Sequence, residues 1–194
     1  MLKKITVLLF LLGSIAMGAQ FQKGTVLFKN NTSKEGYIKI RSHDGLKFKE
    51  NEDDKPIIYS HLQVIGFDID ETKYRYVKRN SIDVEPVILK EMIHGTIVLY
   101  EKEIQGGETS MGFGPDSNLL PVTVDRKSSI VYYMFVNEKL IKIGRKIKNR
   151  HLKILKDCPE LVSKIKNKEI HKTNVITAID YYNEHCGKTP ITED

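Results

Sequence analysis

The sequence predicts an α+β protein, in which an antiparallel β-rich body precedes a helical segment held by a disulfide. Two observations lead to this fold class. Short alternations of apolar and polar residues, bounded by turn residues, recur between residues 24 and 143, as in half-buried antiparallel strands. After Gly144 the apolar spacing changes to three and four residues, and the only two cysteines, Cys158 and Cys186, bracket most of this part.

Length and composition indicate an ordinary folded protein. The chain has 194 residues, of which 40% are apolar and 29% charged, unlike a disordered protein. We expect a signal peptide (residues 1–19), a β-rich domain (20–143), a C-terminal helical cassette packed on it (144–187) and a polar tail (188–194).

The N-terminus has the pattern of an export signal. Lys3 and Lys4 precede an apolar stretch, and Gly18-Ala19 provides small residues for cleavage before Gln20. An uncleaved membrane anchor is the alternative, but residues 5–19 are short of the roughly 20 residues that span a bilayer. We therefore expect an exported protein, periplasmic or secreted, that is soluble after cleavage and has no transmembrane span.

The β-rich body divides into short strands. A meander over residues 24–70 looks like that of small SH3-like or Sm-like barrels, a resemblance of fold that implies no function. The run 131–136 is apolar at every position, which predicts a central strand covered on both faces. Further strands are expected at 74–78, 87–93, 96–104, 119–124 and 140–143.

Between two of these strands, residues 105–118 are expected to form a long loop. It is rich in glycine and carries Met111 and Phe113 at its tip. Long loops in compact domains are usually functional or mobile. Two interpretations remain open: an insertion whose apolar residues fold back on the sheet, or a loop that contacts a partner protein, a ligand or a membrane surface.

Helical spacing begins after Gly144. Asp157 and Glu160 have the spacing of a capping box, and Pro159 suits the first turn of a helix. Gly187 is a natural stop for the last helix. The apolar stripes that predict three helices are Ile147, His151, Ile154 and Leu155; Leu161, Val162 and Ile165; and Val175, Ile179, Tyr182 and Cys186.

In an exported chain the two cysteines most simply form a disulfide, Cys158–Cys186. In the chain-entropy model such a bridge stabilises the fold by roughly 3.5 kcal/mol. A redox pair is the alternative, but it usually has the Cys-x-x-Cys spacing, which the sequence lacks.

The charge is concentrated in one part of the chain. Residues 139–172 hold twelve Lys and Arg residues against three acidic ones. In an exported protein this pattern favours a solvated helical face or contact with an envelope protein or an anionic envelope surface, and not nucleic acid. The candidate basic surface comprises Lys146, Lys148, Arg150, Lys153, Lys164, Lys166 and Lys168.

No catalytic, metal or cofactor motif is recognisable. The six histidines form no His-Glu-x-x-His pair, and no nucleophile elbow, phosphate-binding loop or dinucleotide fingerprint occurs. Asp68 and Asp70 could bind a hard cation, although a solvated strand face is the simpler interpretation. We therefore predict no catalytic residues, no metal site and no cofactor.

Several segments together resemble a group of uncharacterised exported proteins of Bacteroidota. They are Lys23-Gly24-Thr25, residues 35–39 and 44–49, Asp157-Cys158-Pro159, residues 164–168, and Tyr182-Asn183-Glu184-His185-Cys186. The resemblance covers nearly the full length and implies an exported protein with this architecture, without a catalytic activity. Similar sequences are also rich in Gly and Met in the segment corresponding to 105–118.

The function predicted from the sequence is that of a non-enzymatic binding or structural module of the envelope. The contact residues we expect are the Met111/Phe113 loop and the candidate basic surface. The alternative is a hydrolase acting on envelope polymers.

Overall fold

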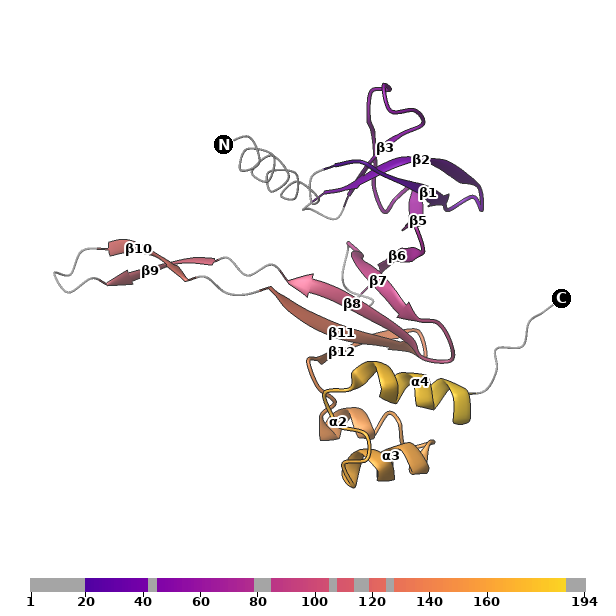
Figure 1. The fold of residues 1–194 in the computed structure, drawn as a ribbon, viewed down its shortest axis with the longest axis vertical. Coiled ribbons are helices and arrows are strands. Elements are labelled where there is room, and N and C mark those ends of the chain that lie inside the picture. The colour runs from indigo at the N-terminus through magenta and orange to yellow at the C-terminus, as the bar shows by residue number, and fades with distance from the viewer. Residues whose placement is uncertain are drawn as a thin grey trace, which may run out of the picture. The chain divides into compact units, whose positions relative to one another are not determined.

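The structure is a computed structural model that describes residues 20–41, 45–78, 85–104, 108–113, 119–124 and 128–187. For residues 108–113 and 119–124 it describes the backbone. The predicted signal peptide and polar tail lie outside the described residues. The chain divides into two compact units, Met1–Tyr76 and Val77–Asp194, whose elements are labelled in Figure 1.

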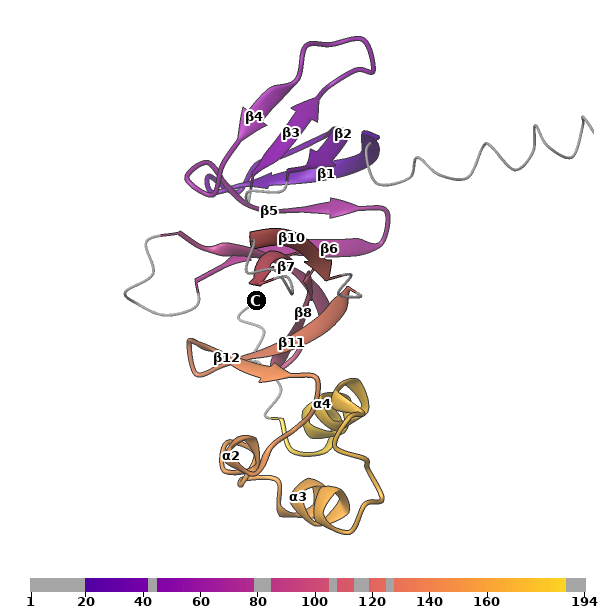
Figure 2. The same cartoon turned by 90° about the vertical axis from the view of Figure 1, so that its left-hand side faces the viewer.

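The first unit is an antiparallel sheet in the order β6-β5-β1-β2-β3-β4 (Figure 2). Its strands are β1 (Gln22–Phe28), β2 (Ser33–Ile40), β3 (Leu46–Lys49), β4 (Ile57–Tyr59), β5 (Val64–Ile69) and β6 (Thr72–Val77). Strand β4 forms an edge of this sheet, and Ile57 and Ile58 are 50% and 52% exposed there.

The core of the first unit comes from cross-strand pairs. Ile38 of β2 lies opposite Phe48 of β3, and Val26 of β1 lies opposite Phe67 of β5. All four side chains are fully buried. Such pairs are the unit of sheet stabilisation, so these four side chains hold β2 to β3 and β1 to β5.

The second unit contains a sheet in the order β12-β11-β8-β7. Its strands are β7 (Val87–Ile93), β8 (Val98–Ile104), β11 (Ser129–Val136) and β12 (Lys139–Gly144). Strand β11 pairs with β8 on one side and with β12 on the other. The central strand predicted from the apolar run 131–136 is therefore confirmed.

The segment expected to be one long loop contains a strand. Strand β9 (Glu108–Phe113) pairs with β10 (Leu119–Val124) as a two-stranded antiparallel sheet. The glycines hid this strand because they lower β propensity, whereas its pairing with residues 119–124 uses backbone groups that glycine also carries. The expectation of a loop over all of 105–118 was thus wrong for residues 108–113.

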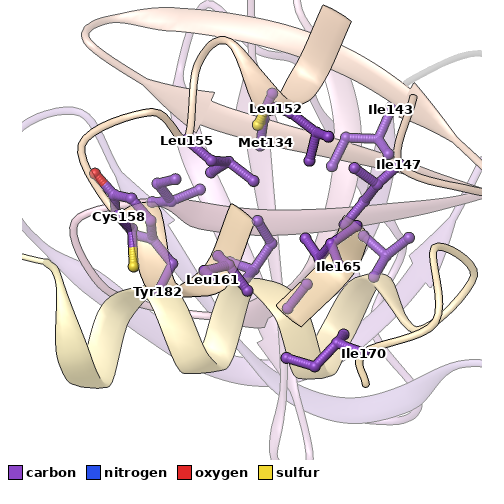
Figure 3. Close-up of a cluster of buried hydrophobic side chains, with 14 of the residues drawn as sticks. Met134, Ile143, Ile147, Leu152, Leu155, Cys158, Leu161, Ile165, Ile170 and Tyr182 are labelled. Carbon is purple, nitrogen blue, oxygen red and sulfur yellow. The ribbon is translucent and has the colours of Figure 1, made fainter. Parts of the chain in front are cut away.

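Three helices follow the sheet of the second unit. They are α2 (Asn149–Leu152), α3 (Pro159–Lys166) and α4 (Val175–His185). Their apolar faces meet one face of the sheet, where Leu99 of β8, Met134 of β11 and Ile143 of β12 are at most 2% exposed. Figure 3 shows Met134 and Ile143 converging with helix residues such as Leu161 and Ile165 in a single core.

The opposite face of this sheet has a smaller core. Val87, Leu89 and Tyr100 are buried, and Tyr133 and Phe135 of β11 pack against them. Because successive side chains of a strand point to opposite faces, β11 contributes Met134 to the helical side and its two aromatic neighbours to the other. The structure is thus α+β, with antiparallel sheets and a C-terminal helical part joined by a disulfide.

Candidate functional site

The cassette is closed by the predicted disulfide. Cys158 caps the N-terminus of α3 and Cys186 follows α4; their Cα atoms are 5.5 Å apart, and the sulfur atoms are bonded. Cys158 is fully buried. The bridge therefore joins the start of one helix to the end of another and fixes both on the core, as the sequence predicted.

A hydrogen bond lies beside the bridge. The Tyr182 hydroxyl donates to Oδ2 of Asp157 at 2.6 Å. Burial, together with this bond, raises the pKa of Tyr182 to about 12. The predicted capping box is therefore wrong: α3 has Cys158 as its N-cap without a side-chain cap bond, because the Asp157 carboxylate accepts the tyrosine hydroxyl instead.

Asn183 fixes α4 to the sheet side of the core. Its Oδ1 accepts the Ile97 N–H at 2.9 Å, and its Nδ2 donates to the Ile97 carbonyl oxygen at 2.9 Å. A Cβ on Gly95 would lie 2.5 Å from Asn183 Nδ2, so only glycine leaves room for the amide. The distinctive C-terminal segments thus contain three residues, Tyr182, Asn183 and Cys186, whose contacts are structural.

A groove lies between the first two helical segments of the cassette. It has a volume of about 790 Å³ and is open to solvent. It is lined by Asn149, Leu152, Lys153, Lys156, Pro159, Val162, Ser163 and Lys166. We call this set the α2–α3 groove.

The lining follows from helical spacing. Residues 149, 152, 153 and 156 are spaced i, i+3, i+4, i+7, and residues 159, 162, 163 and 166 repeat this spacing. Residues at these intervals share one face of a helix. The α3 wall is therefore one face of that helix, whereas the other wall combines the four-residue helix α2 with the turns after it, which hold Lys153 and Lys156.

The floor of the groove is apolar. Leu152 is 8% exposed and belongs to the core, and the partly buried Val162 packs against that core. Pro159, the first residue of α3, is exposed beside them. The floor thus consists of side chains that belong to the core of the cassette or pack on it, and this packing fixes its shape.

The rim is basic. Lys153, Lys156 and Lys166 are exposed, and the lining contains no acidic residue. Among the residues that the structure describes, none of these three ammonium groups has an ion-pair partner. An anion placed over the groove would therefore meet positive charge that the protein itself does not neutralise.

Lys164 differs from the rim lysines. Its Nζ lies 3.6 Å from Glu160 and 3.5 Å from Glu169, and 5.7 Å from the centre of the Tyr181 ring. A side-chain hydrogen bond with Glu160 raises the pKa of Tyr181 to about 12 and holds the pKa of Glu160 below its usual range. Tyr181 also stacks on His185, with ring centroids 4.0 Å apart.

The candidate basic surface thus separates into groups. Lys153 and Lys166 line the groove, whereas Lys164 forms ion pairs with Glu160 and Glu169. Lys146, Lys148, Arg150 and Lys168 lie outside the groove, all exposed. The structure adds Lys156, which the sequence interpretation did not include in the surface.

His151 is the buried polar side chain of the cassette, at 1% exposed. Its Nδ1 accepts the Lys148 N–H at 3.0 Å, and its Nε2 lies 3.0 Å from Arg150 Nε. Burial, and then the neighbouring Arg150 and Lys148 charges, lower the pKa of His151. The imidazole thus packs in the core and accepts the Lys148 N–H at the start of α2, and its burial agrees with its place in the predicted apolar stripe.

Other sequence candidates lie elsewhere. Met111 and Phe113 are in β9, where the structure describes the backbone; their side chains lie outside the description. Asp68 accepts a hydrogen bond from Arg75 Nη1 at 2.6 Å. Within the described ranges, no group of three His, Cys, Asp or Glu side chains is arranged to hold a metal ion.

The groove itself was missed at the sequence level. Its signal is the repeated i, i+3, i+4, i+7 spacing that starts at Asn149 and again at Pro159. Sequence reasoning followed only the apolar stripes that face the core. Val162 belongs to one of those stripes, but the other lining residues lie outside them, and the groove became visible only once the two walls were placed next to each other.

No protein-family model matches the chain, and neither a curated protein nor a solved structure matches it. In the part of the chain that the structure covers, no helix has the length and apolar character needed to cross a membrane.

Proposed function

We propose that the protein is an exported, non-enzymatic binding module whose cassette binds an anionic partner in the envelope. The observation that carries this proposal is the set of three unpaired lysines around the apolar α2–α3 groove. The export pattern of residues 1–19 and the disulfide support the compartment, because disulfides persist in oxidising environments.

The three unpaired lysines of the rim are better explained by binding of an anion than by a contribution to the stability of the fold. Surface ion pairs contribute at most about 1 kcal/mol, and lysines left unpaired contribute no such term. Near an anionic surface, each lysine contributes about 1 kcal/mol of attraction, which is weakened by salt. Lys153, Lys156 and Lys166 together would supply about 3 kcal/mol, or roughly a hundredfold in affinity.

The test is cosedimentation of the mature chain, starting at Gln20, with envelope fractions. The groove variant carries Lys153→Glu, Lys156→Glu and Lys166→Glu. The matched control carries Lys29→Glu, Lys55→Glu and Lys73→Glu, which change the net charge equally at exposed positions of the first unit. We expect binding by the wild type and the control, and a loss of roughly a hundredfold or more in the groove variant, because each Lys→Glu change removes an attraction and adds a repulsion.

Binding of the wild type should also weaken as salt is raised. Equal binding by the groove variant and the control would show that the cassette lysines do not carry the function. Absence of binding by all three proteins would refute the proposal. The alternative, a hydrolase acting on envelope polymers, remains a prediction from the sequence.

A further inference from the structure

We propose that the α2–α3 groove recognises a short acidic protein segment that inserts one apolar side chain between its walls. This inference rests on the proposed function and specifies the partner. The two properties that it joins, an apolar floor and a basic rim with no carboxylate, occur in the same eight residues.

The arrangement of the lysines sets where the acidic groups of the segment would lie. Lys153 and Lys156 belong to the α2 side of the groove, and Lys166 belongs to α3. Positive charge therefore borders the floor from both walls. A segment with carboxylates on both sides of a central apolar residue would place each carboxylate near an ammonium group while the apolar residue covers the floor.

The floor argues for a side chain as the occupant. A purely polyanionic polymer would use the lysines and leave Leu152 and Val162 uncovered. A lipid chain would need an extended apolar cavity that buries most of its surface, whereas this groove is open and has three apolar lining residues. One apolar side chain flanked by acids matches both the extent of the floor and the charge of the rim.

Polar groups at the edge complete the match. Asn149 and Ser163 line the groove, one from each wall. The Asn149 Oδ1 accepts a hydrogen bond from Lys172 Nζ at 3.3 Å, which leaves the amide N–H groups of that side chain for a bound backbone carbonyl. A peptide backbone crossing the groove could thus be oriented as well as attracted.

The experiment uses defined peptides and the intact mature chain. The probe is a fluorescein-labelled peptide with a central leucine between two runs of three glutamates. The matched peptide has serine in place of leucine and the same charge. Fluorescence anisotropy should show that the leucine peptide binds about tenfold tighter or more, because the two differ by one buried apolar side chain.

Protein variants separate the groove from the charge. Ser163→Trp fills the groove and keeps every lysine, and its control, Thr177→Trp, adds the same side chain at an exposed position of α4 outside the groove lining. We expect Ser163→Trp to reduce leucine-peptide binding to the level of the serine peptide, and Thr177→Trp to bind like the wild type. Circular dichroism checks folding; if Ser163→Trp is unfolded, Asn149→Trp replaces it.

Three outcomes would overturn the inference. The first is equal affinity for the two peptides, and the second is full leucine-peptide binding by the groove-filled variant. The third is tighter binding of phosphatidylglycerol vesicles, or of polyglutamate, that groove filling does not change. In that third case, loss of binding to envelope fractions by the Lys→Glu groove variant would still support the proposed function while the peptide inference fails. Failure of the inference can therefore be told apart from failure of the proposed function.

Discussion

Asn183 offers the sharpest test of how the cassette is held. The substitution Asn183→Ala removes both hydrogen bonds to Ile97 and leaves its N–H and carbonyl oxygen without these partners. An unsatisfied buried backbone group costs about 1–3 kcal/mol. Ile97 is fully buried, but Asn183 is only partly buried, so we take values near the lower end and expect a total loss of about 2–4 kcal/mol in the free energy of unfolding.

The control is the same substitution at the other end of α4. Asn174 is the N-cap residue of α4, yet its side chain makes no cap hydrogen bond, and it is exposed. Asn174→Ala should therefore change stability by less than about 0.5 kcal/mol. Urea unfolding of the mature chain, with the disulfide intact and followed by circular dichroism, measures both variants.

A double-mutant cycle checks the geometry. Gly95→Ala would place its Cβ where the Asn183 amide lies, so it should displace that amide and weaken the same two bonds. The double variant Asn183→Ala/Gly95→Ala should then lose less stability than the sum of the single variants. The assigned role of Asn183 would be refuted if Asn183→Ala lowered the free energy of unfolding by less than about 0.5 kcal/mol. Strict additivity of the two single substitutions in the cycle would refute it as well.

Three further predictions concern the cassette. Replacing Cys158 and Cys186 by serine should lower the free energy of unfolding by about 3.5 kcal/mol, measured by urea unfolding, since the closed loop spans a separation of 28 residues. Because the pKa of His151 is lowered in the folded state, the unfolded chain binds the proton first as pH falls, and the stability present above about pH 6.5 should be lost below it. His151→Gln should remove that part of the pH dependence, measured by urea unfolding between about pH 7 and 5. If the free energy of unfolding changed with pH equally in the variant and the wild type, His151 would not be its source. Tyr181→Phe should raise the pKa of Glu160 toward its usual range, because it removes the Tyr181 hydrogen bond, which is the largest cause of the lowered pKa. Carboxyl ¹³C NMR titration measures this pKa, and an unchanged value would contradict the prediction.

The sequence by itself determined the features that depend on local patterns. The period of two predicted half-buried strands over residues 24–70, and Val26, Ile38 and Phe48 lie on the buried face of the first sheet. The period of 3.6 placed Val175 and Ile179 of α4 in the core. These predictions succeed because side-chain direction in a strand or helix depends only on position along the element.

The disulfide was predictable for a different reason. Two cysteines leave one intramolecular pairing, so Cys158–Cys186 needed no knowledge of distance. The export pattern of residues 1–19 is likewise a property of composition and order, and it stays a prediction that the described residues do not address.

Only the tertiary structure decided which polar group meets which. Asp157 and Glu160 have the spacing of a capping box, but Asp157 accepts the hydroxyl of Tyr182, which is 25 residues away in the sequence. Asn183 reaches Ile97 across 86 residues, and nothing in its own segment distinguishes it from a solvent-exposed asparagine. Side-chain hydrogen bonds are short and directional, so their partners are fixed by the packing of distant elements and leave no periodic signal. The α2–α3 groove has the same origin: one wall is a face of α3 and the other is α2 with the turns after it, but the space between them exists only because the shared core places the two walls side by side.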